Sequence, residues 1–507
     1  RIAEAADAAR QVSAALDENA ADLATVQTRM SSLAESIASF NAALRMTDGV
    51  ADAALVRTGA ELHAQVRAAD ELLRMAETTC ARAIQRATAA LSPSVLTSVP
   101  GPGMATDGGL PTGWSTGTGS SGADRAFPPR GLDAAATLAW WRSLTSAEQR
   151  TLITAYGERI GNLDGIPAAV RDEANRAALA RDLLLAQDEV EYYSRVVRGE
   201  PIPQWLVARG WDADPNVVAP VALRRIAVAM SRTILLETYR STSSLVDRQL
   251  LVYQPDSVPP RAAVAVGDVD AAEHVAVVVP GTSTTVAGGL AKMDLEARSV
   301  RNVISQQLDM ERSEVAIVSW IGYSPPMSIL PEAAMQSFAD HGAPELASFT
   351  RGLSATHSDG ALHLTVAAHS YGATLAGRVS SDVANGVDDV IVYGAPGVGS
   401  NPAPGVGRYS MLNDDDPIRY THLVEAHGPV PYEHLVVGTN SSGTSVRITT
   451  EQAEGWTQIP THASETPDGL PLTASSGHDY AVSGTRAEFN VAAVIAGQPE
   501  QALWDVP

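Results

Sequence analysis

Residues 362–373 read LHLTVAAHSYGA, and this stretch decides the fold. The run up to Ala367 is apolar and typical of a strand buried in a sheet. It continues into Ala368, Ser370 and Gly372, the small-x-Ser-x-Gly pattern of a nucleophile elbow, and a helix is expected to follow. The flanking positions must be small because larger side chains would clash across the turn, and alanine meets this requirement where glycine is usual. The pattern predicts Ser370 as a nucleophile.

Apolar runs on both sides of the elbow alternate with helical stretches. We expect strands at residues 250–253, 262–266, 275–279, 315–320, 390–393 and 409–412, and helices at 292–308, 332–350 and 372–385. Such alternation predicts an α/β fold with a mostly parallel sheet and helices on both faces. No helix separates the first two strands, so an antiparallel hairpin is expected at that edge. Residues 246–507 are therefore predicted to form the catalytic domain.

A serine hydroxyl is a weak nucleophile unless a base takes its proton. In proteins with this elbow, an acid and then a histidine follow the serine along the chain. Asp416, held at a turn by Pro417, is the predicted acid, and Asp414 and Asp415 are the alternatives. His478, in a polar loop ahead of the final helix, is the predicted base.

The other histidines are expected to have different roles. His369 adjoins the nucleophile but leaves the elbow on another side, so it is expected to pack or to orient its neighbours. The remaining downstream histidines lie in the segment that follows Asp416, where a lid or cap could sit. They are His422, His427, His434 and His462.

An oxyanion hole needs two backbone N–H groups aimed at the developing negative charge. Tyr371, the residue after the nucleophile, is predicted to supply one. The loop after strand 275–279 is predicted to supply the other from Thr282, with Ser283 as the close alternative, because Gly281 lets the backbone approach the substrate. The residues predicted to bind substrate are Gly281, Ser283, Tyr323 and Met327. The apolar segment 325–330 fits an acyl pocket and an ordinary packed loop equally well.

Composition and motifs exclude several classes of partner. The chain has 507 residues with a formal net charge of −22 and a pI near 4.9, which argues against nucleic acid and against anionic membrane surfaces. It contains no run long enough to cross a membrane as a helix. No HExxH, CxxC, Walker A or strand-to-helix GxGxxG pattern occurs, so neither a metal nor another cofactor is expected.

The N-terminal half is expected to be helical and divided. Residues 1–92 carry two apolar seams around a break at Thr47-Asp48-Gly49, which predicts an antiparallel helical hairpin, with the single cysteine, Cys80, on a seam. Residues 93–130 are rich in Gly, Pro and Ser and are predicted to be a flexible linker. Residues 131–245 are predicted to be helices that pack on the catalytic domain.

Several longer motifs accompany the elbow along the chain. They are Trp140-Trp141, Ile160-Gly161-Asn162-Leu163-Asp164-Gly165-Ile166-Pro167, Val266-Gly267-Asp268, Trp320-Ile321-Gly322-Tyr323, Tyr393-Gly394-Ala395-Pro396-Gly397, Asp416-Pro417-Ile418 and Gly477-His478 with Tyr480. With these motifs the chain, over roughly residues 133–500, resembles an actinobacterial α/β-hydrolase family long catalogued only as a domain of unknown function. The resemblance implies an α/β-hydrolase fold, a Ser370–Asp416–His478 triad, and a segment 160–167 that packs beside the catalytic core. More loosely, the N-terminal hairpin resembles those of type VII secretion substrates.

Two classes of function follow. The first is a carboxylic ester hydrolase of esterase or lipase type acting on a small-molecule or lipid ester, with a peptidase or amidase on the same triad as its alternative. The second is an interaction protein whose hairpin docks a protein partner or a secretion machine. The chain begins at Arg1 rather than Met, so the original N-terminus is expected to have been removed by processing or by design, and a signal peptide could have been lost with it. A secreted or cell-envelope location is slightly favoured over the cytoplasm.

Overall fold

The computed structural model describes most of the chain from residue 132 onward. It covers residues 132–503 except for 216, 218, 328–332, 334, 358–361, 417, 419–426, 433, 440–444 and 452–454, and it adds Thr58, Glu61 and Gln65. The predicted hairpin (1–92) and linker (93–130) thus lie outside the described residues, apart from those three. The described chain divides into two compact units, one of residues 132–183 with 234–503 and one of residues 184–233. The predicted helical segment 131–245 contributes to both units, and its boundaries stay a prediction.

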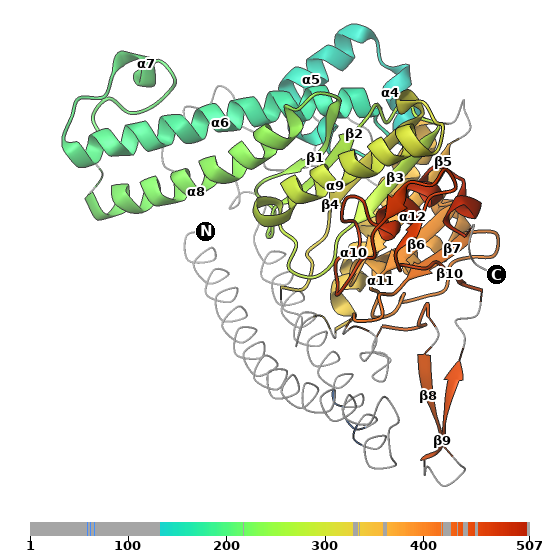
Figure 1. Ribbon diagram of the computed structural model, residues 1–507. Helices are drawn as coiled ribbons and strands as arrows, with labels where there is room; N and C mark the ends of the chain where they lie inside the picture. Colours follow the sequence, from blue (N-terminus) through green and yellow to red (C-terminus); the bar gives the residue numbers. More distant parts are fainter. Residues whose placement is uncertain are drawn as a thin grey trace, which may run out of the picture. The chain divides into compact units, whose positions relative to one another are not determined.

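An eight-stranded sheet forms the centre of the larger unit in the described chain (Figure 1). Its order is β1-β2-β4-β3-β5-β6-β7-β10, with β1 antiparallel to β2, β2 antiparallel to β4, and the remaining neighbours parallel. The strands are β1 (Arg248–Gln254), β2 (Arg261–Val266), β3 (His274–Val279), β4 (Val315–Ile321), β5 (His363–His369), β6 (Asp389–Tyr393), β7 (Gly407–Met411) and β10 (Thr457–Gln458). The predicted α/β-hydrolase fold, with its antiparallel edge, is confirmed.

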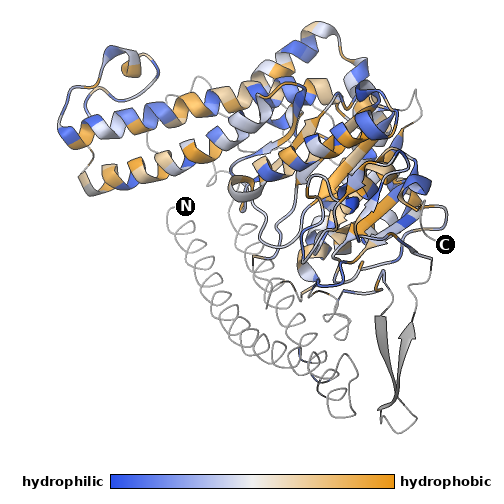
Figure 2. Ribbon diagram, in the orientation of Figure 1, coloured by the Kyte–Doolittle hydropathy of each residue, from blue (hydrophilic) through white to orange (hydrophobic). Residues whose placement is uncertain are grey.

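Helices cover both faces of this sheet. On β3, Val275, Val277 and Val279 face one apolar core, whereas Ala276 and Val278 face the other, as the period of a strand requires. The first core is completed by α10 (Ser337–Thr356) and α11 (Gly372–Ser380), and the second by α9 (Val286–Gln307) and α12 (Arg486–Ile495). Figure 2 shows the hydrophobic residues gathered along the central strands.

The edge strand β1 is covered by α5 (Ser146–Gly161) and the start of α6 (Ala168–Arg198), whereas α4 (Ala134–Ser143) packs against α10. Asn162 pairs its side chain with both backbone groups of Tyr253, at 2.8 Å each. Arg171 donates to the carbonyl of Leu251 at 3.0 Å, and Asn175 donates to that of Leu250 at 2.9 Å. These side chains form hydrogen bonds with backbone groups of β1, which would otherwise be unpaired at the edge of the sheet.

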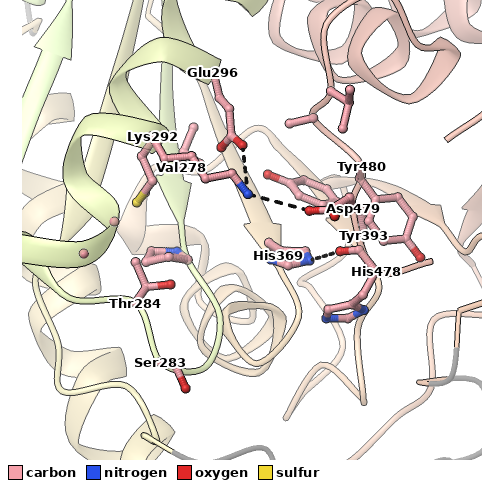
Figure 3. Close-up of a pocket in the computed structure, with 16 residues that line it drawn as sticks. Val278, Ser283, Thr284, Lys292, Glu296, His369, Tyr393, His478, Asp479 and Tyr480 are labelled. Carbon is pink, nitrogen blue, oxygen red and sulfur yellow. Dashed lines mark hydrogen bonds and ion pairs between the residues drawn. The ribbon is translucent and has the colours of Figure 1, made fainter. Parts of the chain in front are cut away.

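A buried ion pair links the sheet edge to α9. Arg248 on β1 reaches Asp294 with two hydrogen bonds of 2.5 Å and 2.9 Å, and both side chains are almost completely buried. A buried charge is costly without its partner, so this pair fixes the position of the first half of α9. That half of the helix forms one wall of a pocket, where Lys292 lies 3.6 Å from Asp479 of a later loop (Figure 3).

The smaller unit, residues 184–233, holds the second half of α6, α7 (Gln204–Val207) and the first half of α8 (Ala219–Ser243). Its core is built on Tyr192, Ile202 and Leu206, and the ring of Tyr192 packs 4.7 Å from that of Trp211. Outside the large sheet, the larger unit also contains the pair β8 (His434–Thr439) and β9 (Ser445–Glu451), the pair β11 (Ser464–Glu465) and β12 (Pro471–Leu472), and 3₁₀ turns at Arg312–Glu314, Val383–Asn385 and Pro499–Ala502.

Candidate active site

Ser370 lies at the sharp turn between β5 and α11. Its φ of 52° is in the left-handed region, which residues with a side chain rarely adopt. The Ser370 amide donates to the carbonyl of Tyr393 at 3.0 Å, which ties the turn to the end of β6. Backbone strain of this kind gathers at functional sites, where the surrounding structure holds it in place.

The small residues of the elbow are needed for close packing. A Cβ atom on Gly372 would lie 2.6 Å from the carbonyl oxygen of Val279 and 2.7 Å from that of Pro280, so no larger residue fits without moving the loop after β3. Ala368 is fully buried and pairs with Val279 on one side and Val392 on the other. The alanine methyl is therefore accommodated where glycine is usual.

The structure brings Asp416, and not its neighbours, to His478. Asp416 Oδ2 lies 2.8 Å from His478 Nδ1, and the carboxylate is fully buried. Asp415 instead accepts a hydrogen bond from the Gly477 amide at 2.7 Å, which holds the loop that carries His478, while Asp414 is exposed. The three aspartates thus occupy different environments, and only Asp416 has the geometry of an acid that orients an imidazole.

Asp416 is held as an anion by three donors. Besides His478, it accepts a hydrogen bond from the Tyr480 hydroxyl at 2.6 Å and from the Ile418 amide at 2.9 Å. Burial raises the pKa of Asp416, but the hydrogen bonds from His478, Tyr480 and Ile418 outweigh it, so the net pKa lies below its ordinary value. The carboxylate is therefore ionised at neutral pH.

His478 lies against the backbone that holds Ser370, the predicted nucleophile. A Cβ atom on Gly394 would lie 2.8 Å from His478 Cε1, and Gly394 directly follows Tyr393, whose carbonyl holds the Ser370 amide. The ring of His369 lies 4.6 Å from that of His478, measured between centroids. Among the hydrogen bonds of the described residues, none joins Ser370 Oγ to His478, and such contacts often tighten only when substrate binds.

The loop after β3 lies directly against Ser370. A Cβ atom on Gly281 would lie 2.6 Å from Ser370 Cβ and 3.2 Å from Ser370 Oγ. The Ser283 amide donates to the carbonyl of Pro326 at 2.7 Å, and its hydroxyl donates to that of Met327 at 2.9 Å. Because the Ser283 amide is already engaged, the geometry favours Thr282 over Ser283 as an oxyanion donor. Tyr371, the other predicted donor, is the N-cap of α11, where the helix dipole favours negative charge.

The other residues predicted to bind substrate have distinct positions. Tyr323 is 1% exposed and donates from its hydroxyl to the Pro280 carbonyl at 2.7 Å, so it supports the loop after β3 from within the core. Met327 is 53% exposed and holds Ser283 through its carbonyl. Residues 328–330 of the predicted acyl pocket lie outside the described residues.

His369 is oriented as a support for the base. Its Nε2 lies 3.0 Å from the backbone oxygen of His478, and burial, together with the nearby His478, lowers its pKa to about 4. His369 is thus neutral near pH 7, and its Nε2–H donates to that carbonyl. Of the other downstream histidines, His427 is buried against the ring of Tyr371, and His462 lies 3.2 Å from Arg486. His422 lies outside the described residues, as does the side chain of His434.

Tyr480 is a supporting residue whose role the sequence pattern did not predict. It is 2% exposed, donates to Asp416 Oδ2 and accepts a hydrogen bond from the Asn413 amide at 3.1 Å. Asn413 in turn donates to the carbonyl of Gly477 at 3.0 Å. The only signal in the sequence is the placement of a tyrosine two residues after the predicted base.

Replacing Tyr480 with phenylalanine is expected to lower kcat/KM by about 10–100-fold, because a hydrogen bond to a charged, buried group is lost. The Asp416 pKa is depressed in the fold, so its contribution to stability is present above its ordinary pKa of about 4 and is lost as pH falls through the folded value. The variant should therefore lose more stability at about pH 7 than at about pH 3.

Denaturant unfolding at the two pH values, with steady-state kinetics, measures both effects. Tyr409→Phe on β7 is a matched control. An equal loss of stability at both pH values, with unchanged kinetics, would show that Tyr480 only fills space.

Metal and membrane features were also sought in the described part of the chain. No group of three or more His, Cys, Asp or Glu side chains there is arranged to hold a metal ion. Within the same residues, no helix has both the length and the apolar character needed to cross a bilayer.

The chain is similar in sequence to known proteins. Residues 256–426 match the family model described as Alpha/beta hydrolase. An uncharacterized protein of Mycobacterium tuberculosis is 31% identical over 278 residues, which is 54% of this chain and 40% of that protein. An uncharacterized protein of Mycobacterium bovis is 32% identical over 199 residues, which is 38% of this chain and 69% of that protein. The chain thus spans 40% of the length of the first of these relatives.

Solved structures give only a loose match. A Pyrobaculum calidifontis esterase in a monoclinic crystal form is 15% identical, with a TM-score of 0.28, over 53% of this chain and 90% of that one. A second structure, of the hyperthermophilic esterase from the same archaeon, is 13% identical, with a TM-score of 0.28, over 61% of this chain and 96% of that one. Superpositions as loose as these carry no inference about the site.

Proposed function

Because the chain belongs to the alpha/beta hydrolase family, we propose that it is a serine hydrolase that cleaves carboxylic esters through an acyl-enzyme intermediate. The observation that carries this proposal is the 2.8 Å contact between the buried Asp416 carboxylate and His478, next to a serine held at positive φ. An acid, a base and a strained serine gathered from three separate loops match the roles of a triad.

The proposed reaction begins when His478 Nε2 takes the Ser370 hydroxyl proton and Ser370 Oγ attacks the acyl carbon. The oxyanion accepts hydrogen bonds from the Tyr371 and Thr282 amides. His478 then returns its proton to the leaving alkoxide, which departs as an alcohol. Water then attacks the acyl carbon while His478 takes its proton, and His478 passes that proton to Ser370 Oγ as the acyl–Oγ bond breaks and the carboxylic acid leaves. Asp416 stays ionised throughout and holds Nδ1–H of the imidazole.

A protein partner remains a separate sequence prediction. The hairpin expected at residues 1–92 would dock that partner, and an exported enzyme delivered by its helical domain would combine both functions. Deleting residues 1–92 and measuring export and ester turnover separately distinguishes the two roles.

The proposal is tested with a fluorophosphonate probe, which reacts only with an activated serine. Wild-type protein should be labelled, Ser370→Ala should not, and Ser381→Ala at the end of α11 is a matched control that should label normally. A panel of p-nitrophenyl esters from acetate to palmitate, with an anilide of the same acyl group, reports ester against amide cleavage and acyl length. Absence of both labelling and turnover in folded wild-type protein would overturn the proposal, and labelling with cleavage of the anilide alone would move it to an amidase.

A further inference from the structure

One face of α8 is apolar and exposed in the part of the chain that the structure describes. It consists of Leu223, Ala227, Met230 and Ile234, which follow one another at spacings of four, three and four and so lie on one side of the helix. Leu223 is 55% exposed, Met230 is 52% exposed and Ile234 is 66% exposed. Their spacing is that of a coiled-coil seam, the row of apolar positions through which one helix packs against another. These four residues are called the α8 seam below.

The α8 seam is distinct from the face of α8 that is already packed. Ala222, Ala229 and Leu236 repeat every seven residues on another face of the helix and are fully buried. The second half of α6 lies alongside α8 (Figure 1), where Glu189 on α6 pairs with Arg225 on α8 at 3.9 Å. A helix that carries a second apolar stripe beside its buried one is typical of a bundle that packs a further helix.

The charge of α8 indicates which kind of helix fits the α8 seam. Residues 219–234 contain three arginines and no acidic residue. A second copy of the same helix would bring like charges together, which disfavours pairing of α8 with itself. An acidic helix with an apolar seam is favoured instead, because opposite charges beside the seam add to the apolar packing.

The chain itself contains a segment of this kind, outside the described residues. Residues 4–44 belong to the first half of the predicted hairpin, and their apolar seam runs from Val12 to Leu44 at spacings of three, four and seven. They carry six acidic side chains and two arginines, so their net charge is −4. Three residues of the second half are described, and each lies in a helix and is exposed: Thr58, Glu61 and Gln65.

The predicted linker is long enough to let this segment meet α8. The 38 residues from 93 to 130 would span about 34 Å root-mean-square as a flexible chain. The 25 residues of α8 make a helix about 37 Å long, so the two lengths are comparable. A tether of this kind holds the segment at an effective concentration on the order of millimolar. A contact too weak to join separate molecules can therefore form within one chain.

We propose that the α8 seam is the docking surface for residues 4–44 of the same chain. Leu223, Met230 and Ile234 pack into the apolar seam of that segment, and the arginines of α8 lie beside its acidic side chains. The smaller unit then holds the N-terminal hairpin, and a protein partner that binds the same seam of the hairpin must compete with α8. The proposal does not depend on the proposed reaction.

Photo-crosslinking in the full-length protein tests this contact directly. The photoreactive residue p-benzoylphenylalanine replaces Met230 in one variant and Leu223 in a second, and it replaces Val228 in a matched control. Val228 lies on the same helix and is 58% exposed, but it is not part of the α8 seam. Light should join positions 230 and 223 to peptides from residues 4–44, in a product of monomer mass, whereas position 228 should give little of that product.

Hydrogen exchange provides a second measurement with natural residues. Met230→Asp should speed amide exchange in residues 12–44 by about tenfold or more, the effect of losing one buried apolar side chain, and Val228→Asp should leave it unchanged. Crosslinked products of dimer mass would overturn the proposal in favour of a second copy of the chain. Crosslinks to other segments, a yield at position 230 no higher than at 228, or exchange in residues 12–44 that Met230→Asp does not alter would also overturn it.

Discussion

Replacing His478 with alanine is expected to lower kcat for ester hydrolysis by about 10⁶-fold, as loss of the base does in other serine hydrolases. The Ser370 hydroxyl is then left without a group to take its proton, since His369 is buried with a pKa of about 4 and its Nε2–H donates to the backbone of residue 478. The leaving alcohol also loses its proton donor. Residual turnover would come from the oxyanion hole and substrate binding alone.

Two controls make this result specific. His341→Ala removes a histidine on α10 that bonds only within its own helix, at Ser337, and should leave kcat close to wild type. Free imidazole should partly restore turnover in His478→Ala, because it can enter the space left by the ring, but it should not rescue Ser370→Ala. Retention of activity within about tenfold in His478→Ala would show that another group is the base.

The central sheet and the turn at Ser370 between β5 and α11 were predictable because each depends on local pattern. The residues around Ser370 must be small for steric reasons, and the alternation of buried strands with helices leaves few topologies. The antiparallel pairing of β1 with β2 was also predictable, because only a short turn separates the two strands. The local pattern of residues was therefore enough to predict the sheet and the turn at Ser370.

The choice among the three aspartates required tertiary structure. The sequence does not show that Asp415 accepts a hydrogen bond from the Gly477 amide, or that Asp416 pairs with His478. The same applies to Tyr480, whose contact with Asp416 depends on a loop returning from far along the chain. The sequence pattern predicts an acid and then a histidine after the serine, but the hydrogen bonds that distinguish neighbouring residues are non-local.

The contact between Lys292 and Asp479 was not predictable from the sequence. Lys292 belongs to α9 and Asp479 to a late loop, so only the fold brings them within 3.6 Å. Conversely, Tyr323 was predicted to bind substrate, whereas its hydroxyl is used within the core to hold Pro280. Whether a polar side chain faces a cavity or supports the wall behind it is decided by packing, which a single sequence does not reveal.

Replacing Asp416 with asparagine is expected to lower kcat by about 10⁴-fold without unfolding the protein. Asparagine has nearly the same shape, and its oxygen at the Oδ1 position can still accept a hydrogen bond from the Ile418 amide. It presents an N–H group where His478 Nδ1–H needs an acceptor, so the imidazole is turned to the wrong tautomer. It also removes the negative charge that stabilises the imidazolium in the transition state.

Asp414→Asn is the matched control, because that residue is exposed and adjacent in the same run. It should keep kcat within about twofold of wild type, as surface changes usually do. Circular dichroism and the unfolding midpoint check that both variants fold. A loss in Asp416→Asn no larger than in Asp414→Asn would contradict the assigned acid. If Asp416 acts only through His478, the double variant Asp416→Asn/His478→Ala should be no slower than His478→Ala alone, because residues that work as a unit are not additive.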